Sequence, residues 1–437
     1  MLSLRASIFV KDGILACLSK SSYGIVAWGM YDWANSAFPA VITTFIFAAY
    51  FTQGIAKNPI AGTHAWADAT ALAGLIIAFI SPILGAAGDL LGRRKPWIAL
   101  FAGVSILSSA LLWFAKPSPA YALWALSWVV VGTVGFELSL VFYNAMMRDL
   151  VPKNYLGRLS GWAWGAGYLG GLLCLVTAFL LIRSRLPWLH LDTKTAEHVR
   201  IAGPLVALWF GLFSLPFFIL TPDRKSTSIR LTTAFQQGLK TLIQMIKEVG
   251  PYRQILKFLI AHMIYIDGLN SLFIFGGIYA AGTFGFTPEE IILFGIAMSI
   301  SAGIGAIGFA WIDDYFGSKN TILLSLTCLI ILLISLLLTH STAWFWVFAL
   351  VLGLFLGPIQ AASRSLMTHL APKEHLTKLF GLYAFSGKIT AFVGPWLFGM
   401  VTMSFHSQRM GMSTALIFLI AGAIILLGVK TRRTYVH

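Results

Sequence analysis

Long apolar runs are the feature that most restricts how this chain can fold. A helix needs roughly 20 apolar residues to cross the ~30 Å hydrocarbon layer of a membrane, and about twelve such runs fill nearly the whole sequence. Because 58% of the residues are hydrophobic and only 11% are charged, we expect an all-α integral membrane protein with twelve transmembrane helices. The approximate helix starts are Gly24, Ala67, Trp97, Tyr121, Leu159, Ile201, Ile255, Glu289, Asn320, Trp344, Leu379 and Gly411.

The net charge of +15 allows two interpretations, nucleic-acid binding or membrane topology. If the N-terminus lies inside, most Lys and Arg residues fall on the inner side, as the positive-inside rule requires, and residues 183–200 form one dissenting outer loop. This favours topology, with both termini in the cytoplasm and no nucleic-acid partner. Residues 1–20 lack a clear cleavage site, so we expect no removable signal peptide. A bacterial cytoplasmic membrane is the expected location, with a vacuolar membrane as the alternative.

Polar residues recur at nearly equal separations along the chain, which indicates an internal duplication. We expect two pseudo-symmetric six-helix halves, residues 1–221 and 255–437. The matching pairs are Asp32 with Asp267, Asn35 with Asn270, Asp89 with Asp314, Leu150 with Leu370, Pro152 with Pro372, Arg158 with Lys378, and Gly161 with Gly381.

The segment between the halves, residues 222–254, is rich in Lys and Arg and carries apolar residues at helical spacing. We expect an amphipathic helix that lies on the cytoplasmic membrane surface, where its basic face meets anionic lipid. A partner-binding role is the alternative. The apolar positions are Phe235, Leu239, Leu242, Ile243 and Ile246.

The stretch from Gly85 to Lys95, with Asp89, Gly92 and two arginines, resembles the signature loop of the major facilitator superfamily. A narrower resemblance is to the vacuole-effluxer-like branch, also called unknown major facilitator family 1. It implies a twelve-helix carrier that works by alternating access, with fungal relatives associated with amino-acid export from the vacuole. The residues that carry it are Tyr31 to Phe38, Tyr143-Asn144, Asp149 to Pro152, Gly157 to Gly161, Gly165, Gly167, Gly170, Gly171, Asp267-Gly268, Ser363 to Ser365, Gly381, Ser386 to Lys388 and Gly394-Pro395.

The fifth predicted helix departs from the antiporter pattern. It has Ala166-Gly167 where an antiporter of the superfamily would carry Gly-Pro before Gly170-Gly171. The sequence of this helix therefore gives little support for antiport.

A cytoplasmic gate is expected where the signature loop and its repeat connect two helices. A carboxylate near a helix end can pair with cations there and hold one closed state, and glycine permits the tight turn. The alternative is that the basic residues only anchor the loop inside the cell. The gate candidates are Gly85, Asp89, Gly92, Arg93, Arg94, Asp314, Gly317 and Lys319.

Ionisable residues within the apolar runs are the substrate and coupling candidates, because such groups usually face a transport pathway. Asp32 can bind a proton or an ammonium group, or it can be a fixed, ion-paired carboxylate. If the charges share a cavity, Arg364 and Lys388 can hold a substrate carboxylate while Asp32 or Asp267 holds an amine. For Arg364, near its helix end, anchoring or gating is the alternative. With the neighbouring polar residues, the full candidate set is Tyr31, Asp32, Asn35, Glu137, Asn144, Tyr168, Asp267, Asn270, Arg364 and Lys388.

No enzymatic motif is found. The sequence lacks a His-Glu-x-x-His zinc motif, a nucleophile elbow and a phosphate-binding Gly-Lys-Ser/Thr loop, and its three cysteines (Cys17, Cys174, Cys328) have no metal-ligand spacing. We expect no enzyme activity, cofactor or metal. The predicted function is secondary transport of a small organic solute, an amino acid or similar zwitterion, by a monomer coupled to protons. Sodium is the rival ion, and a lipid-translocating or ligand-sensing protein is the alternative class.

Overall fold

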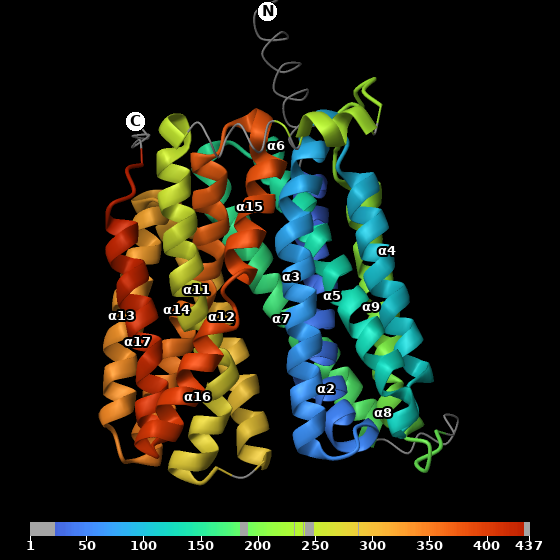
Figure 1. The fold of residues 1–437 in the computed structure, drawn as a ribbon. Coiled ribbons are helices and arrows are strands. Elements are labelled where there is room, and N and C mark those ends of the chain that lie inside the picture. The colour runs from blue at the N-terminus through green and yellow to red at the C-terminus, as the bar shows by residue number, and fades with distance from the viewer. Residues whose placement is uncertain are drawn as a thin grey trace, which may run out of the picture.

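The computed structural model describes residues 22–183, 191–230, 232–238, 240, 249–286 and 288–431, and this part of the chain is a bundle of long helices without strands (Figure 1). Several predictions concern residues outside this range. They are the absence of a signal peptide, the fate of Cys17, the tip of the basic outer loop, both chain ends, and four of the five apolar linker positions.

Six membrane-length spans make up the first half. The first span, Ser22–Ile55, passes from α-helix into a π-helix over Phe38–Phe45, then α2 (Ile46–Tyr50) and a second π-helix (Phe51–Ile55). The later elements are α3 (Pro59–Leu91), α4 (Lys95–Leu111), two 3-10 turns (Leu112–Phe114 and Pro119–Tyr121), α5 (Ala122–Ala145), α6 (Met147–Leu150), a third 3-10 turn (Lys153–Tyr155), α7 (Leu156–Arg183), α8 (Glu197–Arg200) and α9 (Ala202–Leu220).

The second half follows the same plan. Its elements are α11 (Val249–Phe284), α12 (Pro288–Phe316), α13 (Ser318–Leu338), α14 (Thr342–Leu370), a 3-10 turn (Lys373–His375), α15 (Leu376–Lys388), α16 (Val393–Phe405) and α17 (Gln408–Leu427).

Eleven helices in the described residues are long and apolar enough to span a membrane, and the remaining predicted crossing, the eleventh in chain order, is divided between α15 and α16. At the division, the amides of Ala391 and Val393 bond the carbonyls of Lys388 and Thr390, three residues back. Pro395 has no amide hydrogen for the carbonyl of Ala391, which removes a further helical bond. The expected continuous helix is therefore a discontinuous one.

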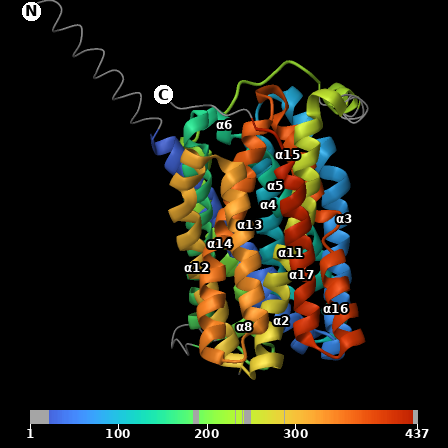
Figure 2. The ribbon, with the colours of Figure 1, turned by 90° about the vertical axis from the view of Figure 1, so that its left-hand side faces the viewer.

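The two halves pack through two crossed helix pairs, α3 against α15 and α7 against α12 (Figures 1 and 2). Small residues make the first contact close: a Cβ on Gly85 would lie 2.4 Å from the carbonyl oxygen of Thr377, and one on Gly381 would lie 2.3 Å from that of Ser81. In contrast, α16 packs mainly on α11 and α17 of its own half. The divided crossing therefore contacts the first half mainly through α15, not through α16.

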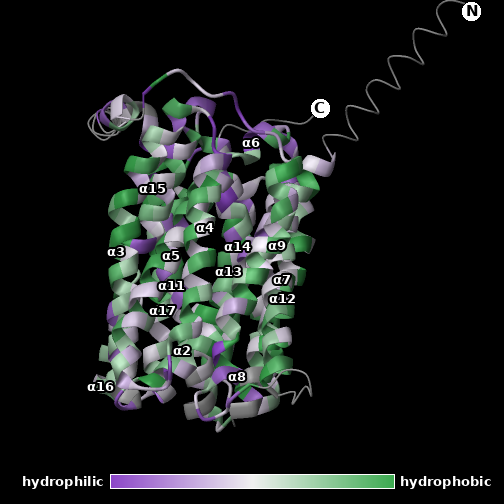
Figure 3. Cartoon of the chain, turned by 90° about the vertical axis from the view of Figure 1, so that its right-hand side faces the viewer, coloured by the Kyte–Doolittle hydropathy of each residue, from purple (hydrophilic) through white to green (hydrophobic). Residues whose placement is uncertain are grey.

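Hydrophobic residues cover the length of the helices, whereas hydrophilic residues gather at the end of the bundle that carries α6 (Figure 3). Residues 221–230, which follow α9, lie at this end, which we call the linker end. The described linker helix, residues 232–238, lies on the first half, because Ala234 is buried and a Cβ on Gly238 would meet the backbone of Ala86. The predicted surface helix is thus described only in its first turns.

Candidate functional site

A buried ion pair joins the two halves in the interior of the bundle. Arg364 on α14 and Asp32 in the first span are 3% and 7% exposed, and the Arg364 Nη1 lies 2.8 Å from the Asp32 Oδ2. The Asn35 Nδ2 approaches the other Asp32 oxygen at 3.5 Å. Burying two charges is favourable only when both are paired and hydrogen-bonded, and this pair meets that condition.

The remaining donors of Arg364 are also used. Its Nε donates to the Ser160 hydroxyl (2.9 Å), Nη2 donates to the Ser160 carbonyl (2.8 Å), and Nη1 reaches the Asn144 side-chain oxygen at 3.3 Å. The guanidinium carbon also lies 5.3 Å from the ring of Trp28 and 5.7 Å from that of Trp164. A planar, five-donor cation surrounded in this way is fixed in place.

Aromatic side chains of the first half pack beside the Arg364–Asp32 pair. The rings of Trp28 and Tyr143 stack at 4.3 Å, and each side chain hydrogen-bonds the backbone carbonyl of the other residue. Tyr31 packs against Tyr143 and donates to the Ser139 hydroxyl at 2.8 Å. Tyr31 therefore packs among aromatic side chains next to Asp32 in the chain and has its own hydrogen-bond partner.

A second ion pair between the halves is more accessible. The Lys388 Nζ, at the end of α15, lies 2.7 Å from the Glu137 Oε1 on α5, and the two side chains are 32% and 20% exposed. The ammonium group also lies at a helix C-terminus, where the helix dipole favours positive charge. The site thus presents one cation and one anion side by side at a helix break.

The other sequence candidates are separate from these pairs. Asp267 on α11 is only 2% exposed, and its Oδ1 has no hydrogen-bond partner among the described residues. Asn270, one turn along, is half-buried. Tyr168 on α7 accepts a hydrogen bond from the Gln360 side chain at 3.2 Å. The structure therefore brings Asp32, Asn144 and Arg364 together, and shows no direct contact from this cluster to Asp267.

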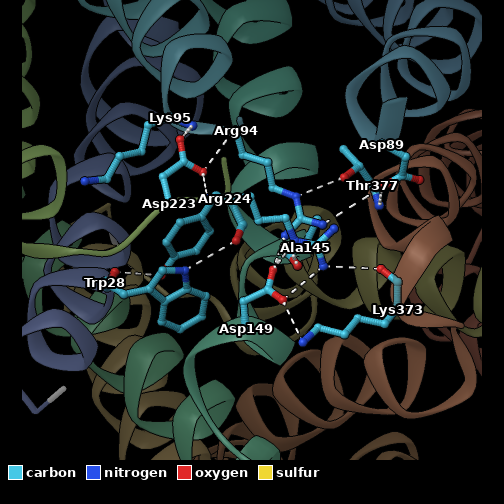
Figure 4. Close-up of polar contacts among 11 residues, drawn as sticks. Trp28, Asp89, Arg94, Lys95, Ala145, Asp149, Asp223, Arg224, Lys373 and Thr377 are labelled. Carbon is cyan, nitrogen blue, oxygen red and sulfur yellow. Dashed lines mark hydrogen bonds and ion pairs between the residues drawn. The ribbon is translucent and has the colours of Figure 1, made fainter. Parts of the chain in front are cut away.

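Charged residues from both halves form a dense network at the linker end (Figure 4). Asp149, on α6, lies 2.7 Å from Arg94, 2.8 Å from Arg224 and 3.4 Å from Lys373. Arg94 also donates to the hydroxyl of Thr377 on the second half. Burial is the main cause that lowers the pKa of Arg94, followed by the Arg224 charge, whereas Asp149 opposes the shift. We call Asp89, Arg94, Asp149, Arg224, Lys373 and Thr377 the gate network.

Two repeat-related aspartates cap helices of the opposite half. Asp89, near the end of α3, accepts from the amides of residues 377–378 at the start of α15, both at 2.9 Å. Asp314, near the end of α12, accepts from the amides of residues 157–158 at the start of α7, at 2.7 and 3.2 Å. Helix N-termini offer unbonded amides and the positive end of the dipole, so each carboxylate fastens one half to the other.

The other gate candidates differ in their contacts. Gly92 has a φ of +81°, and a Cβ there would lie 2.4 Å from the carbonyl oxygen of Lys225, so only glycine fits. Gly317 has a φ of +85° and precedes α13. Arg93 is exposed, and Lys319 donates to the carbonyl of Leu427 in its own half.

Sequence reasoning missed five residues that the structure places in these networks. Ser160 is an ordinary small residue in an apolar helix, and Thr377 gives no signal before α15 is placed beside Arg94. Asp149 occurred in the family resemblance and carried a charge at a helix end, which could have identified it. The complete set is Ser160, Asp149, Arg224 and Thr377, together with Asp223, which accepts a hydrogen bond from the Arg94 amide at 3.1 Å.

Comparison with known proteins identifies relatives for nearly all of the chain. Residues 66–437 match the family described as "Vacuole effluxer Atg22 like". An uncharacterized MFS-type transporter, YxiO, from Bacillus subtilis is 26% identical, with 92% of this chain and 93% of that protein covered. Autophagy-related protein 22 from Pichia angusta is 24% identical over 60% of this chain. The matched region covers about half the length of that relative.

Solved structures with the same fold are more distant in sequence. The proton:xylose symporter XylE has a TM-score of 0.74 at 13% identity, with 94% of this chain and 96% of that one covered. The transporter FucP in its outward conformation has a TM-score of 0.72 at 14% identity, with 94% and 99% covered. The helical bundle described above is thus the major facilitator fold.

Proposed function

The chain belongs to the vacuole-effluxer (Atg22-like) family, and on that premise we propose that it moves a small organic zwitterion, such as an amino acid, by proton-coupled alternating access. Family and fold make it a multi-pass membrane protein and an MFS-type transporter rather than an enzyme. Its partners in that role are a small-molecule substrate and the lipid bilayer. The zwitterion and the coupling ion are our proposal.

The Glu137–Lys388 pair is the observation that carries the proposal. An amino acid presents a carboxylate and an ammonium group a few bonds apart, so it can offer a counter-ion to each residue at once. Separating a partly buried pair is unfavourable because each charge is left without its counter-ion. A zwitterion that inserts between Glu137 and Lys388 avoids this cost, since neither side chain loses an opposite charge.

The Arg364–Asp32 pair is less suited to direct substrate contact. Its guanidinium is almost fully buried, and each of its three nitrogens already donates a hydrogen bond. We propose that this pair ties the first span to α14 and moves as a unit during the cycle. The role of Asp32 in coupling remains a prediction.

The position of the gate network supports alternating access. Both aspartate caps and the Asp149 cluster join the halves at the linker end, while α16 stays with its own half. We propose that the linker end is cytoplasmic and that this conformation is closed there. Opening requires the caps and the ion pairs to separate, and an ion gradient supplies the energy, with a proton as our choice and sodium as the rival.

Counterflow in proteoliposomes tests the substrate class. Vesicles loaded with pooled unlabelled amino acids should take up the labelled pool through the native protein without an imposed gradient. Glu137→Gln and Lys388→Gln should each lower exchange by at least tenfold, because each removes one substrate contact.

The double variant Glu137→Gln/Lys388→Gln separates binding from folding. It restores charge balance, so it should be as stable as the native protein and still fail to exchange. Native-like exchange by the double variant, or no exchange of any amino acid by folded native protein, would contradict the proposal. The second result would favour lipid translocation or ligand sensing instead.

A further inference from the structure

The break between α15 and α16 leaves backbone oxygens without helical partners. The amides of Ala391 and Val393 bond three residues back, so they do not serve the carbonyls of Gly387 and Ile389, which a continuous helix would have used. Unbonded carbonyl groups inside a membrane protein need another partner, and in discontinuous helices they serve as cation ligands.

Asp267 lies directly beside this break. The hydroxyl of Thr390, within the break, neighbours the Asp267 carboxylate. A Cβ on Gly394 would lie 3.0 Å from the backbone oxygen of Asp267 and 2.5 Å from the Ser271 hydroxyl, so α16 and α11 are in close contact here. Neither the Asp267 Oδ1 nor the Thr390 Oγ1 has a hydrogen-bond partner in the described part of the chain.

No basic side chain of the described residues forms an ion pair with Asp267. Arg364 on α14 and Lys388 on α15 are engaged with Asp32 and Glu137, and the Lys378 ammonium, without a hydrogen-bond partner in that part of the chain, lies near the other end of α15. His262, earlier on α11, has its Nδ1 2.9 Å from the Ser386 hydroxyl. Asp267 is only 2% exposed. A carboxylate buried to this extent is costly unless a cation or a proton neutralises it.

The internal repeat shows that the equivalent aspartates of the two halves differ in their counter-ions. Asp32 and Asp267 are equivalent, and Asp32 is neutralised by Arg364. The repeat position that corresponds to Arg364 is Asn144, which carries no charge. Asp32 in the first half is therefore neutralised by a permanent cation from the second half, whereas the first half has no cation at the equivalent position for Asp267.

We propose that Asp267, the Thr390 hydroxyl and the freed carbonyls of Gly387 and Ile389 form a binding site for one monovalent cation, either a sodium ion or a proton. The site deepens the proposed function, on which it rests, by placing the coupling ion at Asp267 rather than Asp32. The cation neutralises the carboxylate and bridges α11 to the discontinuous helix that carries Lys388. Ion binding and the substrate pair are thus connected through residues 388–390.

Direct binding to purified protein in detergent micelles tests this site without any substrate. Saturable binding of ²²Na⁺ by the native protein, weakened at least tenfold in Asp267→Asn and in Thr390→Val, would identify sodium. A protonated-carboxyl infrared band at neutral pH that is lost in Asp267→Asn, without ²²Na⁺ binding, would identify a proton.

Two controls match the test variants. Thr402→Val makes the same change on α16, away from the break, at another buried hydroxyl without a partner in the described residues, and Asp192→Asn removes an exposed carboxylate. Both should behave as the native protein does. If Asp267→Asn does not fold, Thr390→Val is used to test sodium binding. Asp267→Glu is then used for the infrared measurement, and its protonated-carboxyl band should persist at a shifted position.

The inference is overturned if native protein shows neither signal, or if ²²Na⁺ binding is unchanged in Asp267→Asn. Failure of amino-acid counterflow alongside a positive binding result would instead reject the proposed substrate and leave the cation site standing.

Discussion

At the scale of single residues, the structure pairs charges that the sequence only places within apolar runs. Sequence patterns identify Asp32, Glu137, Arg364 and Lys388 as unusual, because ionisable groups are costly in hydrocarbon. They do not tell which acid meets which base, since the partners come from opposite halves and their contacts depend on how those halves pack. The sequence does not predict the contact between Ser160 and Arg364 for the same reason.

Removing one member of the buried pair should destabilise the protein strongly. Asp32→Asn leaves the Arg364 guanidinium without its counter-ion, which costs about 3–5 kcal/mol in comparable buried pairs. We expect a clearly lower unfolding temperature, measured by intrinsic fluorescence in detergent. Asp68→Asn is the control, because Asp68 pairs with His64 on the surface, where an ion pair contributes about 0–1 kcal/mol. Equal unfolding temperatures for Asp32→Asn and native protein would contradict the interpretation of this pair.

At the scale of helices, the apolar runs predict all the crossings, but not the shape of each one. Hydropathy cannot show that the eleventh predicted helix is divided, because the residues on both sides are equally apolar. Pro395 and Gly394 are local signals of the break, yet proline also lies inside continuous helices of this chain, as at Pro82 and Pro358. The neighbouring helices decide which proline interrupts a helix.

The contact between α3 and α15 should be sensitive to one added methyl group. In Gly381→Ala, the new Cβ would lie 2.3 Å from the carbonyl oxygen of Ser81, so the helices must separate and the linker-end gate should weaken. We expect a loss of thermal stability comparable to overpacking in cores, about 1–3 kcal/mol. Gly399→Ala on α16 is the matched control, since no atom lies within 4 Å of its Cβ. A Gly381→Ala protein as stable as Gly399→Ala would rule out close packing here.

At the scale of the whole molecule, the internal repeat and the charge distribution predict two halves and a topology. The fold is confirmed by the helical bundle and by its structural relatives. The domain boundaries and the sidedness of the membrane stay predictions. The two ion pairs between the halves could not be predicted, because they form only once the first span, α5, α14 and α15 have come together.

The topology can be tested by labelling single cysteines in whole cells with a membrane-impermeant thiol reagent. In a background without Cys17, Cys174 and Cys328, Lys194→Cys should react from outside, because residues 191–196 lie at the end opposite the linker. Lys225→Cys should react only after the membrane is permeabilised. The reverse pattern would show that the linker end faces outward.

Alternating access between two rigid halves is the central claim, and the distance between them at the linker end tests it most directly. Spin labels at Arg93→Cys and Glu374→Cys, both exposed, would report that distance across the gate in the same cysteine-free background. We predict that pooled amino acids produce a second population with a longer distance, and that Lys388→Gln does not show it. A single, unchanged distance with and without amino acids, in protein that binds them, would contradict the account.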